Sequence, residues 1–165
     1  MTVRVVCPGS FDPMHVGHLD IFERAAARFD EVVVAVVHNP NKRSSLLSTE
    51  QRLELIEAET AHLDNVRVEA FTGLLVDFCL ANDIGLICKG LRGVSDFEYE
   101  LQMAQMNQRI AGVETVFLST DPQHAYLSSS LVKEVAKLGG TIDGTLPPRV
   151  QAALESMLAE GRGAG

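Results

Sequence analysis

The sequence contains few cysteines, and their spacing is not typical of a disulfide framework. Its three cysteines, Cys7, Cys79 and Cys88, are odd in number and form no C-x-x-C pair. This usage argues against a disulfide-stabilised scaffold and favours a reducing compartment. Cys79 and Cys88 lie within apolar runs, where we expect them to be core residues and not ligands.

Long hydrophobic runs are lacking as well. The longest uninterrupted apolar stretch, residues 32–37, is far shorter than the roughly 20 residues that a membrane-spanning helix needs. The first residues lead directly into Val-Arg-Val-Val-Cys, without the charged and then apolar stretch of a secretory signal. We therefore expect a cytoplasmic protein.

Basic residues are outnumbered by acidic ones. The 14 Lys and Arg against 22 Asp and Glu give a net charge of −8 and an isoelectric point near 5.0. Proteins that bind nucleic acids or anionic membranes broadly need a basic surface, so we expect neither partner. An anionic small molecule stays compatible with this balance, because a few cations in one cleft can outweigh a distant acidic surface.

Short β-branched runs alternate with stretches of helical length along the 165 residues. We expect strands at residues 3–7, 32–37, 66–70, 86–88 (with its neighbour Ile84) and 115–119. We expect helices at residues 19–29, from 48, 74–82, 96–111, from 128 and from 147. This alternation predicts an α/β fold, a Rossmann-like parallel sheet of about five strands with helices on both faces. We expect a single domain over residues 1–160 and a disordered tail over residues 161–165.

Polar clusters follow four of the predicted strands. They cover residues 8–18, 38–43, 89–93 and 128–134. Doubly wound parallel sheets bind ligands beyond the carboxyl ends of their strands, where the strand order reverses. The common position of the clusters favours one shared site over four unrelated solvated turns.

The first cluster combines features of an anion site. Gly9 permits a tight turn, and Asp12 and Pro13 are expected to be the N-cap and first residue of a helix. The free N–H groups and the dipole of that helix would attract an anion. His15 and His18 are three apart and therefore share a helix face. A capping or solvated role stays open for each histidine, and a zinc site would need further ligands.

Each of the other clusters could also have a purely structural role instead of binding a ligand. Lys42 and its neighbour Arg43, taken alone, would form a solvated basic turn. Lys89 and Arg92 alternate with glycines, which indicates either backbone held close to a ligand or an ordinary turn. The three serines at 128–130 could cap a helix or donate hydrogen bonds to a phosphate.

Three segments resemble one enzyme family. Residues 9–18, Gly-Ser-Phe-Asp-Pro-Met-His-Val-Gly-His, are similar to the [ST]-F-D-P-x-[HT]-x-G-H signature of the nucleotidyltransferase superfamily. Residues 128–134, Ser-Ser-Ser-Leu-Val-Lys-Glu, and residues 89–107, beginning Lys-Gly-Leu-Arg-Gly, resemble one branch, the bacterial phosphopantetheine adenylyltransferases. The resemblance extends with matching spacing from residue 5 to about residue 148.

The resemblance implies a reaction and its partners. Enzymes of this family transfer AMP from ATP to 4′-phosphopantetheine, which gives 3′-dephospho-coenzyme A and pyrophosphate in coenzyme A biosynthesis. The family implies Mg²⁺ bound with ATP and a homohexamer. Because the acceptor phosphate is already an anionic nucleophile, no general base and no covalent intermediate are expected. Catalysis would then consist of alignment and charge stabilisation.

The resemblance also implies roles for individual residues. The expected catalytic residues are Ser10, His18, Lys42 and Arg92, with His18 holding the α-phosphate oxygens. The expected phosphopantetheine-binding residues are Ser10, Lys42, Leu75 and Lys89. The expected ATP-binding residues are Ser10, Phe11, His18, Gly90, Leu91, Arg92, Glu100, His124, Ala125, Tyr126, Leu127, Ser128, Ser129 and Ser130.

Three positions depart from the family pattern. Lys89 stands where many relatives carry arginine, so a point charge replaces a bidentate fork. Gly73 stands where some relatives have an acidic residue, and His124 where an aromatic ring often lies near adenine.

Two other functions are weighed against this resemblance. Transferases for nicotinamide mononucleotide share the H-x-G-H element but usually carry an arginine in the second signature, where this chain has Lys133 and Glu134. A nucleotide-binding regulator without activity would be expected to have one damaged signature.

Overall fold

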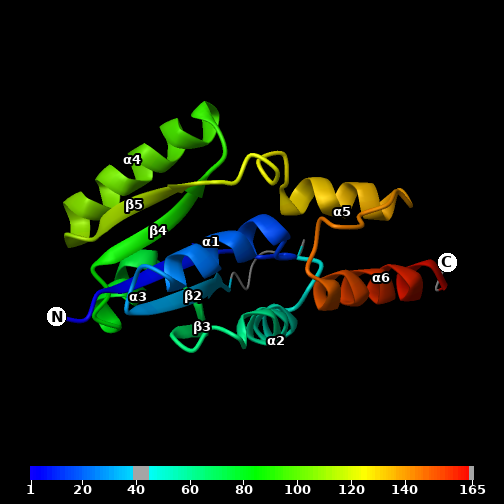
Figure 1. Cartoon of the computed structure of the whole chain (residues 1–165), viewed down its shortest axis with the longest axis horizontal. Helices are drawn as coiled ribbons and strands as arrows, with labels where there is room; N and C mark the ends of the chain where they lie inside the picture. Colours follow the sequence, from blue (N-terminus) through cyan, green and yellow to red (C-terminus); the bar gives the residue numbers. More distant parts are fainter. Residues whose placement is uncertain (39–44, 164–165) are drawn as a thin grey trace.

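The structure, a computed structural model, describes residues 1–38 and 45–163 and forms a three-layer arrangement of helices and one sheet (Figure 1). The strands are β1 (Arg4–Gly9), β2 (Glu31–Val37), β3 (Val66–Phe71), β4 (Leu86–Leu91) and β5 (Glu114–Ser119). The helices are α1 (Val16–Ala26), α2 (Thr49–Thr60), α3 (Leu75–Ala81), α4 (Val94–Ala111), α5 (Ser129–Lys137) and α6 (Pro148–Gly163).

All five strands are parallel and lie in the order β3-β2-β1-β4-β5. The chain winds outward from β1 in one direction to β3 and then returns to β4 on the other side. The reversal therefore falls between β1 and β4, where a doubly wound sheet forms its ligand crevice. The predicted Rossmann-like parallel sheet is confirmed.

The two faces of the sheet are covered by different helices. Alternate residues of β1 point to opposite faces, so Val5 joins the core formed with α1, α2, α5 and α6, whereas Val6 joins the core formed with α3 and the end of α4. β2 is apolar on both faces, as is typical of a central parallel strand. Cys79 and Cys88 are buried core residues, as predicted.

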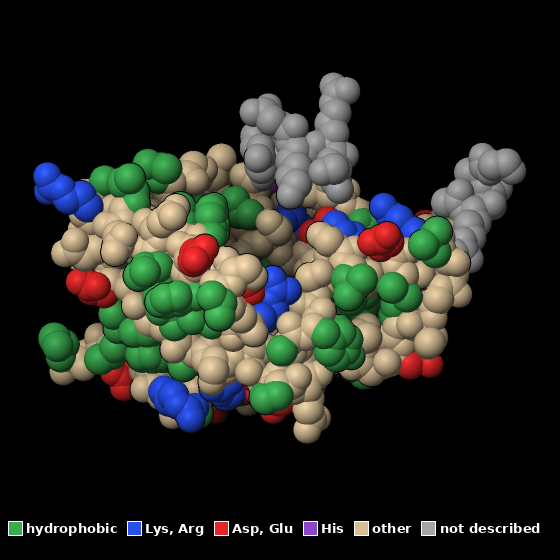
Figure 2. Space-filling view, turned by 90° about the horizontal axis from the view of Figure 1, so that it is seen from above, with side chains coloured by type: hydrophobic (Ala, Val, Ile, Leu, Met, Phe, Trp, Pro, Cys, Tyr) green, Lys and Arg blue, Asp and Glu red, His purple; other side chains and the backbone are tan. Residues whose placement is uncertain are grey.

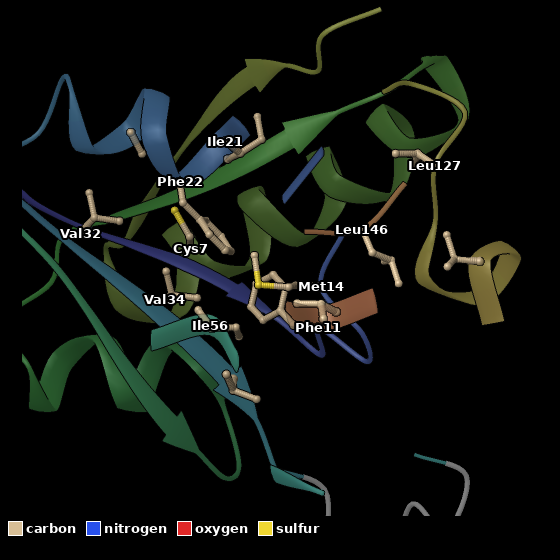
Figure 3. Packing of buried hydrophobic residues seen from close by; sticks show 14 of the residues in the cluster. Cys7, Phe11, Met14, Ile21, Phe22, Val32, Val34, Ile56, Leu127 and Leu146 are labelled. Carbon is tan, nitrogen blue, oxygen red and sulfur yellow. The ribbon is translucent and has the colours of Figure 1, made fainter. Parts of the chain in front are cut away.

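The larger core extends to the carboxyl end of β1, where aromatic rings determine the local geometry (Figure 3). Phe11 packs edge-on against Phe22, with ring centroids 5.3 Å apart. A Cβ atom on Gly9 would lie 2.7 Å from the ring of Phe11. The predicted tight turn at Gly9 is wrong, because this residue ends β1 and its missing side chain makes room for the ring.

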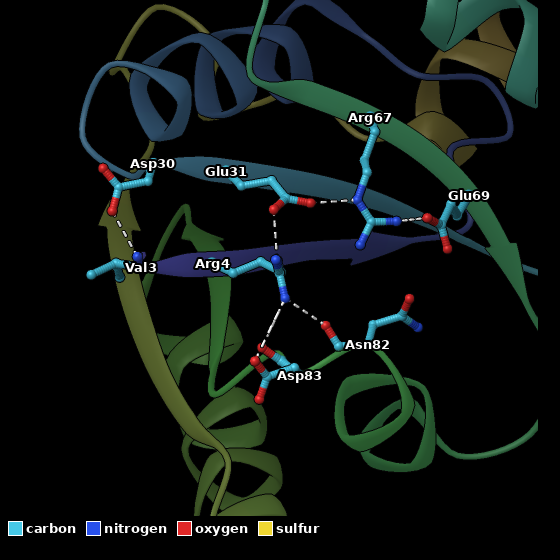
Figure 4. A network of polar contacts seen from close by, with 8 residues as sticks. All are labelled: Val3, Arg4, Asp30, Glu31, Arg67, Glu69, Asn82 and Asp83. Carbon is cyan, nitrogen blue, oxygen red and sulfur yellow. Dashed lines mark hydrogen bonds and ion pairs between the residues drawn. The ribbon is translucent and has the colours of Figure 1, made fainter. Parts of the chain in front are cut away.

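An ion-pair network joins the amino ends of the strands, opposite the crevice (Figure 4). The carboxylate of Glu31 accepts hydrogen bonds from Arg4 and Arg67, both at 2.6 Å. These two guanidinium groups hold the pKa of Glu31 below its usual value. Arg4 also donates to the carbonyl of Asn82 at 3.0 Å. The network fixes β1, β2 and β3 relative to one another without occupying the crevice.

Three predicted boundaries differ from the structure. β4 continues to Leu91, so Lys89 belongs to the strand and not to the loop after it. α1 begins at Val16 with His15 as its N-cap, which makes the predicted cap at Asp12 wrong. α6 continues to Gly163, whereas we expected a disordered tail from residue 161.

Within the described ranges, no helix has the length and the apolar composition that crossing a membrane requires.

Candidate active site

A cleft of about 490 Å³ lies at the carboxyl ends of β1 and β4. Its size falls within the range of small-molecule sites. The space-filling view shows the hollow with basic side chains beside it (Figure 2). Its polar and glycine lining includes His15, Gly17, His18, Lys89, Gly90, Arg92, Ser95, Asp96, Glu100, Thr120, Ser128 and Ser129. The prediction that polar residues after separate strands meet in one place is therefore confirmed for the first, fourth and fifth strands.

The start of α1 holds two histidine rings in a fixed arrangement. The rings of His15 and His18 stack with centroids 3.6 Å apart. The backbone N–H of His15 donates to Nδ1 of His18 at 3.1 Å. Because Nδ1 accepts this bond, the ring proton of neutral His18 lies on Nε2. Neutral His18 thus carries an imidazole N–H donor at the helix start, and such a donor can stabilise developing charge on a phosphate oxygen.

Both histidines are kept neutral by their surroundings. Burial, with the nearby Arg92 and His124, lowers the pKa of His15 to about 4. Burial, followed by His15, Arg92 and Lys89, lowers the pKa of His18 well below its usual value. Among the described residues that line the cleft, the cations are Lys89 and Arg92, whereas His18 is neutral at neutral pH.

The low pKa of His15 predicts a pH dependence of stability. The unfolded chain takes up a proton at His15 near pH 6.5, but the folded chain does so only near pH 4. The free energy of unfolding should therefore decrease as pH falls between these values, by about 1.4 kcal/mol per pH unit for each such histidine. His15→Gln should reduce this slope by up to that amount.

Urea denaturation followed by circular dichroism between pH 5 and 8 measures the slope. At pH 7.5–8, residue 15 is neutral in both the folded and the unfolded chain. The free energies of unfolding measured there therefore give the effect of the substitution on packing alone. A slope that is the same in His15→Gln and in the wild type would contradict the neutral, buried state of His15.

Each cation of the cleft has a carboxylate partner. Lys89 lies 3.3 Å from a carboxylate oxygen of Glu100. Arg92 pairs with Asp96 at 2.9 Å and donates to the carbonyl of Leu127 at 2.6 Å. Lys89, expected on the phosphopantetheine side, is thus joined to Glu100, expected on the ATP side. A phosphate that enters the cleft must share or replace these carboxylates.

The serines at the start of α5 confirm the capping interpretation, whereas donation to a phosphate stays a prediction. Ser128 is the N-cap of α5, and its hydroxyl accepts from the N–H of Leu131 at 3.1 Å. Ser129 donates to the carbonyl of Pro13 at 2.7 Å, which connects the second signature to the first. Ser128 and Ser129 nevertheless line the cleft.

The predicted site residues divide into three groups. Those that line the cleft are Phe11, His18, Lys89, Gly90, Arg92, Glu100, Ser128 and Ser129. Those that are not among its lining are Ser10, Leu75, Leu91, His124, Ala125, Tyr126, Leu127 and Ser130. Ser10 is exposed directly after β1, and Leu75 packs on the core at the start of α3. Lys42 lies outside the described residues, and all roles in binding and catalysis stay predictions.

Two buried polar groups, Asp12 and Arg52, could not be predicted from the sequence. Asp12 is 6% exposed and accepts three hydrogen bonds, where we expected a helix cap. Arg52, on α2, is 5% exposed and donates to the carbonyls of Ser10 and Val37. An aspartate before a proline and an arginine within an amphipathic helix give no sequence signal of burial. Their burial is explained by partners that include residues distant in the sequence.

Comparison with known proteins places this geometry among nucleotidyltransferases. Residues 6–135 match the cytidylyltransferase-like family. The phosphopantetheine adenylyltransferase of Corynebacterium diphtheriae is 56% identical over 151 residues, which are 92% of this chain and 95% of the relative. That of Corynebacterium efficiens is 54% identical over 153 residues, 93% of this chain and 96% of the relative.

Solved structures that are more distant in sequence share the fold. A protein from Vibrio parahaemolyticus, provisionally named a nicotinate-nucleotide adenylyltransferase, superposes with a TM-score of 0.68 at 19% identity over 96% of this chain and 95% of that protein. A lipopolysaccharide core biosynthesis protein from Thermoplasma volcanium gives a TM-score of 0.52 at 20% identity over 73% of this chain and 98% of that protein. At these identities the likeness extends to the fold alone.

Proposed function

The chain belongs to the phosphopantetheine adenylyltransferases of the cytidylyltransferase-like family, and from this membership and the cleft we propose which of its residues perform the reaction. It transfers AMP from ATP to the phosphate of 4′-phosphopantetheine. The products are 3′-dephospho-coenzyme A, in coenzyme A biosynthesis, and pyrophosphate.

One observation carries the assignment of roles: the cleft at the strand reversal combines a neutral imidazole donor with two cations. His18 presents Nε2–H from the start of α1, while Lys89 and Arg92 reach the same cleft from β4 and the residues after it. Both substrates of this reaction are phosphate anions. Lys89 and Arg92 can receive these anions once the phosphates share or replace their carboxylate partners, Glu100 and Asp96.

The reaction needs alignment more than proton transfer. The 4′-phosphate attacks the α-phosphorus of ATP in line with the departing pyrophosphate, so one P–O bond forms as another breaks. His18 donates from Nε2 to the α-phosphate oxygens as charge develops on them. Lys89, with Lys42, holds the acceptor phosphate, and Arg92 holds the phosphates of ATP. Neutral His18 keeps its proton throughout, because the attacking group is already an anion.

The remaining predicted contacts surround the two substrates. Ser10, exposed at the end of β1, contacts both phosphates, and Leu75 lies along the pantetheine arm. Nucleotide contacts are provided by Phe11, Gly90, Leu91, Glu100 and residues 124–130. Residues 124–130 follow β5 and lead into α5, and Ser128 and Ser129 of this segment line the cleft.

Mg²⁺ is proposed to arrive with ATP. Among the residues that the structure describes, no group of three or more His, Cys, Asp or Glu side chains is placed to hold a metal ion. A cage made by the protein therefore does not fit these residues, and the triphosphate itself is the expected ligand. No step of the proposed transfer depends on a metal held by the chain.

The enzyme is proposed to act as a homohexamer in the cytoplasm. Three buried cysteines suit a reducing compartment. α4 exposes Tyr99, Met106 and Ile110 by 64, 56 and 55%, and contacts between subunits would cover such side chains. Light scattering at micromolar concentration tests the assembly, and a monomer would contradict it.

Pyrophosphate release in the presence of ATP and Mg²⁺ tests the choice of acceptor. We expect release with 4′-phosphopantetheine and little with nicotinamide mononucleotide or without an acceptor. A preference for the mononucleotide would contradict the proposal, and so would ATP binding without release with either acceptor.

A further inference from the structure

Asp12 lies where three distant segments of the chain meet. Its carboxylate is 6% exposed and accepts hydrogen bonds from the backbone N–H groups of Leu46 and Leu47, at 2.9 and 2.8 Å. The same carboxylate pairs with Nζ of Lys133 on α5 at 3.0 Å. The two N–H groups and the ammonium together hold the pKa of Asp12 below its usual value despite its burial.

Two further contacts join the same segments beside Asp12. Ser129, at the start of α5, donates to the carbonyl of Pro13. Arg52, on α2, donates to the carbonyl of Ser10 at 2.7 Å. Residues 10–13 are thus joined on one side to the segment that leads into α2 and on the other side to α5.

These segments belong to different halves of the proposed site. Residues 46–47 follow the segment of Lys42, which is expected to hold the acceptor phosphate. Lys133 lies one turn into the helix whose start, with Ser128 and Ser129, faces the nucleotide. Asp12 itself and Lys133 are not among the residues that line the cleft.

We propose that Asp12 is a positioning residue for adenylyl transfer, whose carboxylate holds the acceptor-side segment at residues 46–47 and the ATP-side helix α5 in one fixed relation. This inference rests on the proposed function. In-line attack requires the reacting atoms to be aligned closely, and a misplacement of about 1 Å can cost 10²-fold in rate. Asp12 would set this alignment without touching either substrate.

Asparagine at position 12 is the informative replacement. It keeps the volume of the side chain but offers one carbonyl oxygen in place of two carboxylate oxygens, and it leaves the ammonium of Lys133 without its counterion. We expect Asp12→Asn to lower kcat at least tenfold while each KM changes less than threefold. Lys133→Met, which breaks the same ion pair from the other end, should have a similar effect.

The double variant distinguishes a shared function from two separate ones. If Asp12 and Lys133 act through one contact, Asp12→Asn with Lys133→Met should have a kcat no lower than that of the worse single variant. Lys133→Arg restores a cation opposite Asp12 and should recover most of the rate. Lys137→Met, which removes a cation from the last turn of the same helix, is the matched control and should leave kcat unchanged.

Steady-state kinetics test whether Asp12 is a positioning residue. The folded fraction of each sample is measured by circular dichroism. The proposal is overturned if folded Asp12→Asn retains kcat within twofold, if the two single losses multiply in the double variant, or if only a KM changes. Should Asp12→Asn not fold, Lys133→Met and Lys133→Arg still decide it, because equal rates in the two would exclude the contact. Failure of the wild type to use 4′-phosphopantetheine would instead contradict the proposed function.

Discussion

His18→Ala lowers kcat about 10²–10³-fold, while the KM of each substrate changes only a few-fold. The loss corresponds to about 3–4 kcal/mol of transition-state stabilisation, the usual effect of removing one preorganised donor from an oxyanion. His18 has this role because its Nδ1 accepts from the N–H of His15, which leaves Nε2–H as the donor. Initial rates at saturating ATP and 4′-phosphopantetheine measure the effect.

Two controls accompany this substitution. His62→Ala removes an exposed histidine that pairs with Glu23, outside the lining of the cleft, and should leave kcat unchanged. The loss in His18→Ala should be equal at pH 7 and pH 8, because the lowered pKa keeps the ring neutral at both values. Activity of His18→Ala within a few-fold of the wild type would contradict the assignment.

Lys89→Ala raises the KM for 4′-phosphopantetheine at least tenfold and changes the KM for ATP less. Arg92→Ala does the reverse, or lowers kcat if its contact tightens only in the transition state. Each charge-assisted contact to phosphate contributes about 1.5–3 kcal/mol. Lys42→Ala should resemble Lys89→Ala. Steady-state kinetics with one substrate varied at a saturating level of the other separate these effects.

Lys89→Arg is the matched control for the acceptor side. It keeps the charge opposite Glu100 and should retain most activity, because a phosphate accepts a fork as well as a point charge. If Lys89→Ala acted mainly on ATP, or Arg92→Ala mainly on 4′-phosphopantetheine, the division of the cleft between the two substrates would be wrong.

The fold could be predicted from the sequence because its strands carry the signal of a buried parallel sheet. The six apolar residues at 32–37 are too few for a helix of usual length and too continuous for a half-exposed strand. The ends of the strands are harder to predict than their buried centres. Lys89 and Gly90 resemble a loop by composition, yet they continue β4 and pair with β5.

The site could be predicted in part. That His18, Lys89 and Arg92 line one cleft could be predicted, because polar residues at the carboxyl ends of separate strands gather at one edge of a parallel sheet. The tautomer of His18 could not be predicted, because it depends on the N–H of His15 at the cap of α1. The buried position of Asp12 could not be predicted, because its three partners come from residues 46, 47 and 133, which local sequence does not connect.

Direct in-line transfer between two bound substrates is tested by the stereochemistry at the α-phosphorus. The measurement uses one diastereomer of adenosine 5′-O-(1-thiotriphosphate) with 4′-phosphopantetheine and determines the configuration of the thio-substituted dephospho-coenzyme A. A single displacement, aligned by His18, Lys89 and Arg92 without a covalent intermediate, predicts inversion. Retention of configuration would require two displacements through an adenylylated enzyme and would contradict this mechanism.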